Sequence, residues 1–225
     1  MGKLVLLLTL ALSTLIASPV LAYATFTWPP SVEFSVFATS FEPRATGLAL
    51  QPGFNLSLGN AAGFGAGITT SWNDTLSTTF TASYARTDVR LSGSAVTSSS
   101  GGSISGGNIA VMPLAAMVQL RSRRFGRAMP YAEAGVTYLL VPSSTVKPAL
   151  AAAGISELRR PDHIALITGA GLQIGLKGPW LADLNLTYRP FSQSIFPATP
   201  SGQVLKEKNL DIHPLVIAAG LAYRF

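Results

Sequence analysis

Cysteine is absent from the 225-residue chain, and charged residues are scarce. Without cysteine, no disulfide can stabilise the fold. Charged residues make up 12% of the chain, against about 25% in a typical soluble domain, whereas hydrophobic residues make up 48%. We therefore expect part of the apolar surface to face lipid rather than water.

The one extended apolar stretch lies at the N-terminus, where residues 1–22 have the pattern of a secretory signal peptide. Lys3 supplies the charged start, and Val20-Leu21-Ala22 supplies a small-residue cleavage site after the apolar stretch. Cleavage is expected before Tyr23, with Ala22-Tyr23-Ala24 as a second site. A retained membrane helix is the alternative, but the stretch is shorter than the about 20 residues that span a bilayer.

The expected mature domain, residues 23–225, contains no run long enough for a transmembrane helix. A closed barrel is the other structure that pairs every backbone N–H and C=O group in lipid. The formal charge of +6 raises the question of nucleic acid. Export and the dispersed basic residues argue against it and favour an anionic lipid surface as the partner.

Strict alternation of apolar with small or polar residues identifies the strands of such a barrel. In the last segment Leu215, Ile217, Ala219, Leu221, Tyr223 and Phe225 share one face, and Arg224 lies on the other. The same test predicts seven further strands, for a total of eight antiparallel strands: Val32–Thr39, Phe64–Trp72, Leu76–Tyr84, Leu114–Leu120, Ala132–Leu140, Ile164–Ile174 and Ala182–Tyr188.

The predicted connections alternate between short and long, as in an outer-membrane barrel with short periplasmic turns and long external loops. Short turns are expected at Asn73-Asp74, around Arg123 to Arg127, and at Lys177-Gly178-Pro179-Trp180. The expected external loops run from Glu42 to about Ala61, Thr87 to Asn108, Pro142 to Asp162 and Pro190 to Asp211. The Ser/Gly-rich run Ser98 to Gly107 is expected to be irregular, and Pro148 to Gly154 to form a helical turn or two.

Outward aromatic residues should collect at the two membrane interfaces. The expected periplasmic group is Trp72, Trp180, Tyr223 and Phe225, and the expected external group is Tyr84, Tyr138 and Tyr188. A soluble β-sandwich would also favour aromatic residues, but it would not sort them into two outward girdles.

The segment from Pro130 to Tyr138 has the pattern Pro-Tyr-x-x-Ala-Gly-x-x-Tyr, and the chain ends on the segment from Asp211 to Phe225. The first segment resembles a strand of the OmpW family of small outer-membrane barrels, and the second is similar to that family's last strand. Two further segments resemble the family: Met112-Pro113-Leu114, which opens the predicted fourth strand, and Trp180-Leu181-Ala182-Asp183, which opens the predicted seventh strand. The resemblance implies a Gram-negative outer-membrane protein that forms a narrow channel for small, mostly hydrophobic molecules, with lateral release into the bilayer as one route.

The terminal residues resemble the signal that the barrel assembly machinery recognises. This signal falls on Phe225, supported by Tyr223 and Leu221. These three side chains are also suited to the lipid-facing belt, and both roles can hold together.

An eight-stranded barrel is only wide enough for its own side chains, so a broad pore is not expected. Glu33, Glu133, Asp183, Arg189 and Arg224 are expected in the lumen, where buried charges must be paired. They form either a structural plug or a selective gate. The full predicted lining is Glu33, Phe37, Met117, Gln119, Glu133, Leu139, Asp183, Asn185, Arg189 and Arg224.

Within that lining, Phe37, Met117 and Leu139 either line an apolar pocket or simply pack the lumen. Pro113 and Pro214 are expected near external strand ends, where the missing N–H either opens a lateral exit or only ends a strand.

No catalytic residue, metal site or cofactor is expected. The histidines, His163 and His213, lie near external strand ends, where lipopolysaccharide-modifying enzymes of the barrel type keep their chemistry. Neither has a His-x-Ser partner, so we expect no enzyme. A structural or adhesion barrel without transport remains the other alternative. The expected partners are outer-membrane lipid and lipopolysaccharide, the assembly machinery and small hydrophobic solutes.

Overall fold

The computed structural model describes residues 31–42, 48–51, 54–92, 103–122, 125–146, 157–159, 163–198, 208–212 and 214–225. The expected signal peptide, its cleavage site and the helical turn at Pro148 to Gly154 lie outside these residues. No helix in this part of the chain is long and apolar enough to cross a membrane.

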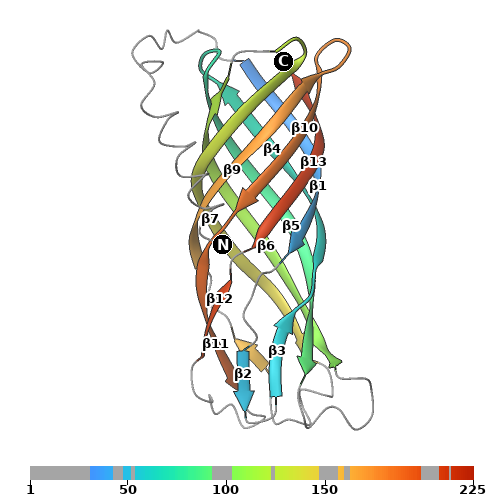
Figure 1. Ribbon diagram of the computed structural model, residues 1–225, viewed down its shortest axis with the longest axis vertical. Coiled ribbons are helices and arrows are strands. Elements are labelled where there is room, and N and C mark those ends of the chain that lie inside the picture. Colours follow the sequence, from blue (N-terminus) through green and yellow to red (C-terminus); the bar gives the residue numbers. More distant parts are fainter. Residues whose placement is uncertain are drawn as a thin grey trace.

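Eight antiparallel strands form a closed ring, which confirms the predicted barrel (Figure 1). In order around the ring they are β1 (Ser31–Glu42), β4 (Ala61–Ser71), β5 (Leu76–Ser92), β6 (Ser103–Arg121), β7 (Ala128–Val146), β9 (His163–Gly175), β10 (Trp180–Tyr188) and β13 (Leu215–Arg224). Pairing of β13 with β1 closes the ring.

The wall extends further outward than the sequence predicted. β5 and β6 pair as far as Ser92↔Ser103, so residues 103–107, expected to be irregular, belong to a strand. Likewise β7 continues past Pro142 to Val146. The prediction was wrong here because strands that leave the bilayer need no apolar alternation, while cross-strand hydrogen bonds still pair their backbone.

Five shorter strands occupy segments that were expected to be loops. β2 (Leu48–Gln51) and β3 (Phe54–Leu58) form a hairpin that pairs with the outer part of β5. β11 (Phe191–Ala198) pairs with β12 (Lys208–Ile212) and with β8 (Glu157–Arg159). These strands lie at one end of the barrel and the C-terminus at the other (Figure 1).

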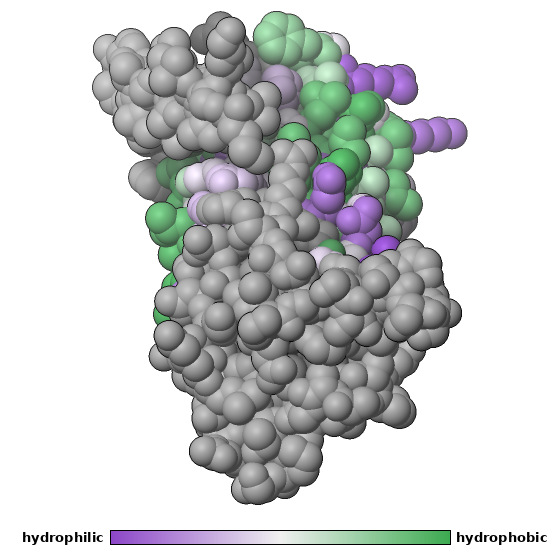
Figure 2. All heavy atoms as spheres, turned by 60° about the horizontal axis from the view of Figure 1, so that its bottom comes forward, coloured by the Kyte–Doolittle hydropathy of each residue, from purple (hydrophilic) through white to green (hydrophobic). Residues whose placement is uncertain are grey.

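Side chains alternate between the two faces of the wall as predicted. Phe80 and Leu166 point outward and are 61% and 67% exposed, whereas the neighbouring Ile167 points inward and is 1% exposed. Figure 2 shows hydrophobic side chains over much of the visible wall. Apolar exposure on this scale is suited to contact with lipid acyl chains.

The described residues agree with all three predicted short turns, and only Arg123 and Arg124 of the second turn lie outside them. In the first, Asn73 Oδ1 accepts hydrogen bonds from the backbone N–H groups of Thr75 and Leu76, at 2.8 and 2.6 Å. The other two place Gly126 and Gly178 at φ values of 64° and 69°, a left-handed conformation that suits glycine. These turns therefore link their strands as tight hairpins.

Three aromatic side chains gather where the ring closes at the periplasmic rim. Tyr223 packs edge-on against Trp180 and Phe225, with ring centroids 5.1 and 4.9 Å apart. The backbone N–H of Phe225 donates to the Val32 carbonyl at 2.9 Å, which extends the seam between β13 and β1. Phe225 thus combines lipid-facing area with the last hydrogen bond of the closing ladder.

Replacing Phe225 with Asp should reduce the amount of folded barrel in the outer membrane several-fold, because it places a charge at the lipid-facing seam. Phe125→Asp is the matched control, since Phe125 is similarly exposed but lies in a turn. Heat-dependent gel mobility of membrane fractions measures the folded form. Equal folded yields of the two variants would contradict an assembly role for Phe225.

Candidate functional site

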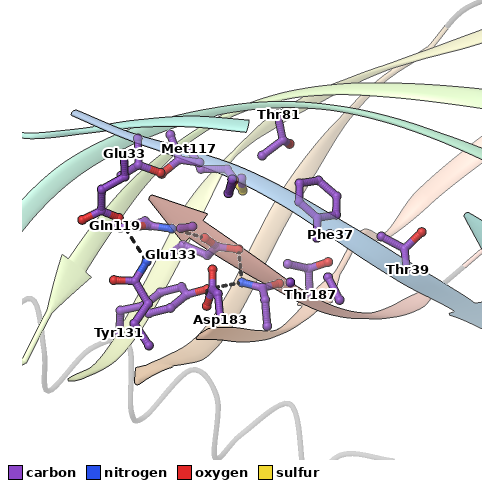
Figure 3. A pocket seen from close by; sticks show the side chains of 18 of the residues that line it. Glu33, Phe37, Thr39, Thr81, Met117, Gln119, Tyr131, Glu133, Asp183 and Thr187 are labelled. Atoms are coloured by element: carbon purple, nitrogen blue, oxygen red, sulfur yellow. Dashed lines mark hydrogen bonds between the residues drawn. The ribbon is translucent and has the colours of Figure 1, made fainter. Parts of the chain in front are cut away.

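The barrel encloses a cavity lined by side chains from its inward faces (Figure 3). The structure places eight of the predicted lumen residues on it: Glu33, Phe37, Met117, Gln119, Glu133, Asp183, Asn185 and Arg189. Arg224 instead lines a second cavity with Arg127 and Gly178, at the periplasmic mouth. Leu139 is buried in β7.

An ion-pair cluster around Glu33 occupies the periplasmic end of the lumen. Glu33 Oε1 lies 3.0 Å from Arg121 Nη1 and 2.6 Å from Arg224 Nη2. Arg121 also donates to Ser71 Oγ at 2.8 Å, and Gln173 Nε2 donates to Glu33 Oε2 at 3.3 Å. The cluster therefore ties together five strands: β1, β4, β6, β9 and β13.

This cluster separates the two cavities. Glu33 lines the inner cavity, Arg224 lines the periplasmic mouth, and Gln173 borders both. The side chains of Glu33 and Arg121 are only 1% and 3% exposed. Because the charges are paired at short distance at the periplasmic end of the lumen, between the two cavities, they close the passage toward the periplasm.

A second network lies next to this cluster and uses neutral donors. Glu133 accepts hydrogen bonds from Gln119 Nε2 at 3.0 Å and from Asn185 Nδ2 at 2.8 Å. The Tyr131 hydroxyl donates to Asp183 Oδ1 at 2.9 Å and accepts from Asn185. Glu133 and Asp183 are thus held by amides and a phenol rather than by arginine (Figure 3).

Further out, the cavity lining changes from charged groups to threonine and apolar side chains. Phe37 and Met117 face the cavity beside Thr39, Thr81 and Thr187. Glycines make room for the aromatic rings: a Cβ added at Gly65 would meet the ring of Phe37, and one at Gly171 the ring of Tyr131. Apart from Arg189, the outer part of this cavity therefore presents threonine hydroxyls and apolar side chains.

Arg121, Tyr131 and Gln173 belong to the two networks but are not in the predicted lumen lining. The predicted strand ends at Leu120, one residue before Arg121. The inward series of Met117 and Gln119 continues to Arg121, so the sequence does contain the signal for it. Tyr131 and Gln173 lie on the inward faces of their strands, which are the faces that carry predicted lumen residues. Parity alone does not show which inward groups meet.

The expected position of Pro113 near an external strand end is wrong, because β6 begins at Ser103 and continues past Pro113 to Arg121. Pro214 directly precedes β13, and its carbonyl accepts a hydrogen bond from the Arg189 N–H at 3.2 Å. His163 opens β9, while His213 lies outside the described residues.

Among the described residues, no group of three or more His, Cys, Asp or Glu side chains is arranged to hold a metal ion.

Replacing Glu33 with Gln should lower the free energy of unfolding by about 3 to 5 kcal/mol, because Arg121 would remain buried without its counter-charge. The same change should increase ionic conductance through the barrel, since the cluster closes the lumen. Denaturant unfolding in micelles and single-channel recording measure the two effects. Asp88→Asn, at an exposed carboxylate on β5, is the control. Wild-type stability and conductance in E33Q would show that the cluster neither stabilises nor closes the barrel.

Comparison with solved structures agrees with this fold. OprG from Pseudomonas aeruginosa superposes with a TM-score of 0.73 at 17% identity, over 87% of this chain and 96% of OprG. AlkL, solved in lipid bilayers, gives 0.63 at 18% identity, over 90% of this chain and 92% of AlkL. E. coli outer membrane protein W gives 0.51 at 20% identity, over 86% of this chain and 97% of that protein.

The sequence itself also identifies the family. No functionally curated protein matches it closely enough to count as a relative. The OmpW family, however, matches residues 34–225, which include all but the first three residues of the barrel wall. The chain therefore belongs to the OmpW family and is a β-barrel of the bacterial outer membrane.

Proposed function

We propose that this barrel takes up small, mostly hydrophobic molecules from outside the cell and releases them sideways through its wall. The observation that carries this proposal is a break in the hydrogen-bonded ladder between β5 and β6. The ladder reaches Ala82↔Leu114 and resumes at Ala85↔Val111. Pro113 lies in the interval, and proline has no backbone N–H to donate.

The surroundings of the break support an exit at this position. On the other side of β6, the register with β7 shifts between Ala110 and Met112, and such bulges bend a strand locally. Thr81 on β5 and Met117 on β6 line the cavity close to the interval. On the outer face, Leu114 is 38% exposed where the wall meets lipid. The cavity therefore comes close to the interval, because Thr81 on its wall pairs with Ala115, two residues from Pro113.

The closed periplasmic end favours the sideways route. A solute in the outer part of the inner cavity meets the paired charges of Glu33 and Arg121 on its way to the periplasm. Entering that region requires breaking a buried ion pair. An apolar molecule gains nothing from such a region. Passage into the bilayer keeps it in an apolar environment throughout.

Pro214 is the weaker candidate for an exit. It directly precedes β13, whose pairing with β1 and with β10 continues without interruption from Leu215. Its position is that of a residue that starts a strand, where proline is tolerated. We therefore place the exit at Pro113.

Replacing Pro113 with Ala should reduce uptake of a hydrophobic dye into protein-containing vesicles several-fold, because the restored N–H allows the ladder to close. Leu114→Trp should have the same effect by covering the break. Ionic conductance should stay at the wild-type level in both variants. Pro130→Ala, at the periplasmic start of β7, and Leu215→Trp, beside Pro214, are the matched controls.

Two results would count against the proposal. Unchanged dye uptake in both P113A and L114W, with loss in L215W, would move the exit to Pro214. A folded wild-type barrel that transfers no more dye than empty vesicles would leave the alternative of a structural or adhesion barrel.

A further inference from the structure

Among the residues that the structure describes, Arg189 is a lumen cation that forms no ion pair. It follows β10 at the outer end of the strand and lines the inner cavity. Its Nε is buried and makes no hydrogen bond. Thr187, two residues earlier on the same inward face, also has a buried Oγ1 without a hydrogen-bond partner. Two neighbouring donors are thus left unsatisfied on one wall of the cavity, where buried polar groups normally have partners.

The side chains around this pair are largely apolar. Thr187 pairs across to Val216 on β13, which is buried. On the other side, Thr187 pairs with Gly169 of β9, and the fully buried Ile167, two residues before Gly169, packs with Ala115 and Met117. A guanidinium in such surroundings is costly unless a counter-charge is present.

The acidic groups of the lumen have their hydrogen bonds elsewhere. Glu33 is paired with two arginines, and both oxygens of Glu133 accept from amides. Glu133 acts on Arg189 only as an electrostatic neighbour. Within the described part of the chain, no carboxylate forms an ion pair with Arg189.

We infer that Arg189 and Thr187 bind the carboxylate head group of an amphipathic solute. A guanidinium donates through a planar fork that matches a carboxylate, and the threonine hydroxyl adds a third donor. The apolar tail then lies in the cavity against Phe37 and Met117. This inference rests on the proposed function and narrows its substrate class to molecules with an apolar body and one negative charge.

The charge pattern also directs such a solute toward the wall. Below Arg189 the cavity presents Glu133 and Asp183, which repel an anion that moves toward the periplasm. A periplasmic turn follows the end of β6 at Arg121, and another precedes the start of β10 at Trp180. Pro113 and Arg189 lie at similar distances along their strands from these two turns. A carboxylate held at Arg189 therefore places its tail at the height of the break between β5 and β6.

The test compares an acid with its uncharged ester. The probes are 11-(dansylamino)undecanoic acid and its methyl ester, whose fluorescence rises in an apolar site. Both are titrated into the full barrel in lipid nanodiscs, with empty nanodiscs as background. Arg189→Gln should weaken binding of the acid about tenfold and leave the ester unchanged, as expected for loss of a charge-assisted hydrogen bond. Arg189→Lys should fall between the two. Arg86→Gln, at an exposed arginine on the outer face of β5, is the matched control.

The outcomes separate this inference from the proposed function. Equal binding of the acid by R189Q and by the wild type overturns the inference. So does a wild-type barrel that binds the ester as tightly as the acid, a result that requires no variant to fold. If the acid shows the Arg189 dependence but neither probe crosses vesicles, the site stands and the transport proposal fails. If both probes cross equally and R189Q has no effect, transport stands and the site fails.

Discussion

Closure of the ring between the first and last barrel strands is the constraint on which the rest of the structure depends. In lipid no water is available to pair a free strand edge, so β1 and β13 must pair along their length. The same register sets Glu33 opposite Arg224, with both side chains directed inward. The closing ladder therefore creates half of the ion-pair cluster that blocks the lumen. Stability of the wall and closure of the passage have one structural origin.

The lumen is divided along its length by how its charges are satisfied. At the periplasmic end, arginine pairs with glutamate at short distance. In the middle, Glu133 and Asp183 are held by neutral donors. At the outer end, Arg189 has no ion-pair partner among the described residues and faces a cavity of threonine and apolar side chains. An eight-stranded barrel has room for little more than its own side chains, so this order of polar groups decides what the remaining space accepts.

A closed wall can tolerate a break only where neighbouring pairs hold the strands in place. Beyond Pro113 the ladder of β5 and β6 continues to Ser92↔Ser103, so pairing on both sides of the interval keeps the strands together. The outward extension of these strands, which the sequence did not predict, therefore has a mechanical role. It encloses the weak part of the wall within a longer ladder, and it allows the interval to persist without opening the barrel.

The sequence by itself determined the number of strands in the barrel wall, their inward and outward faces and the short turns, because the alternation that lipid contact requires repeats every two residues and is local. It also placed eight of the lumen residues on the cavity wall. Only the tertiary structure decided which of them meet. Glu33 and Arg121 are 88 residues apart, and their contact depends on the register accumulated around the ring. The structure likewise decided the outer extent of β5 and β6, because strands outside the bilayer are held by backbone pairing, which leaves no alternating pattern in the sequence.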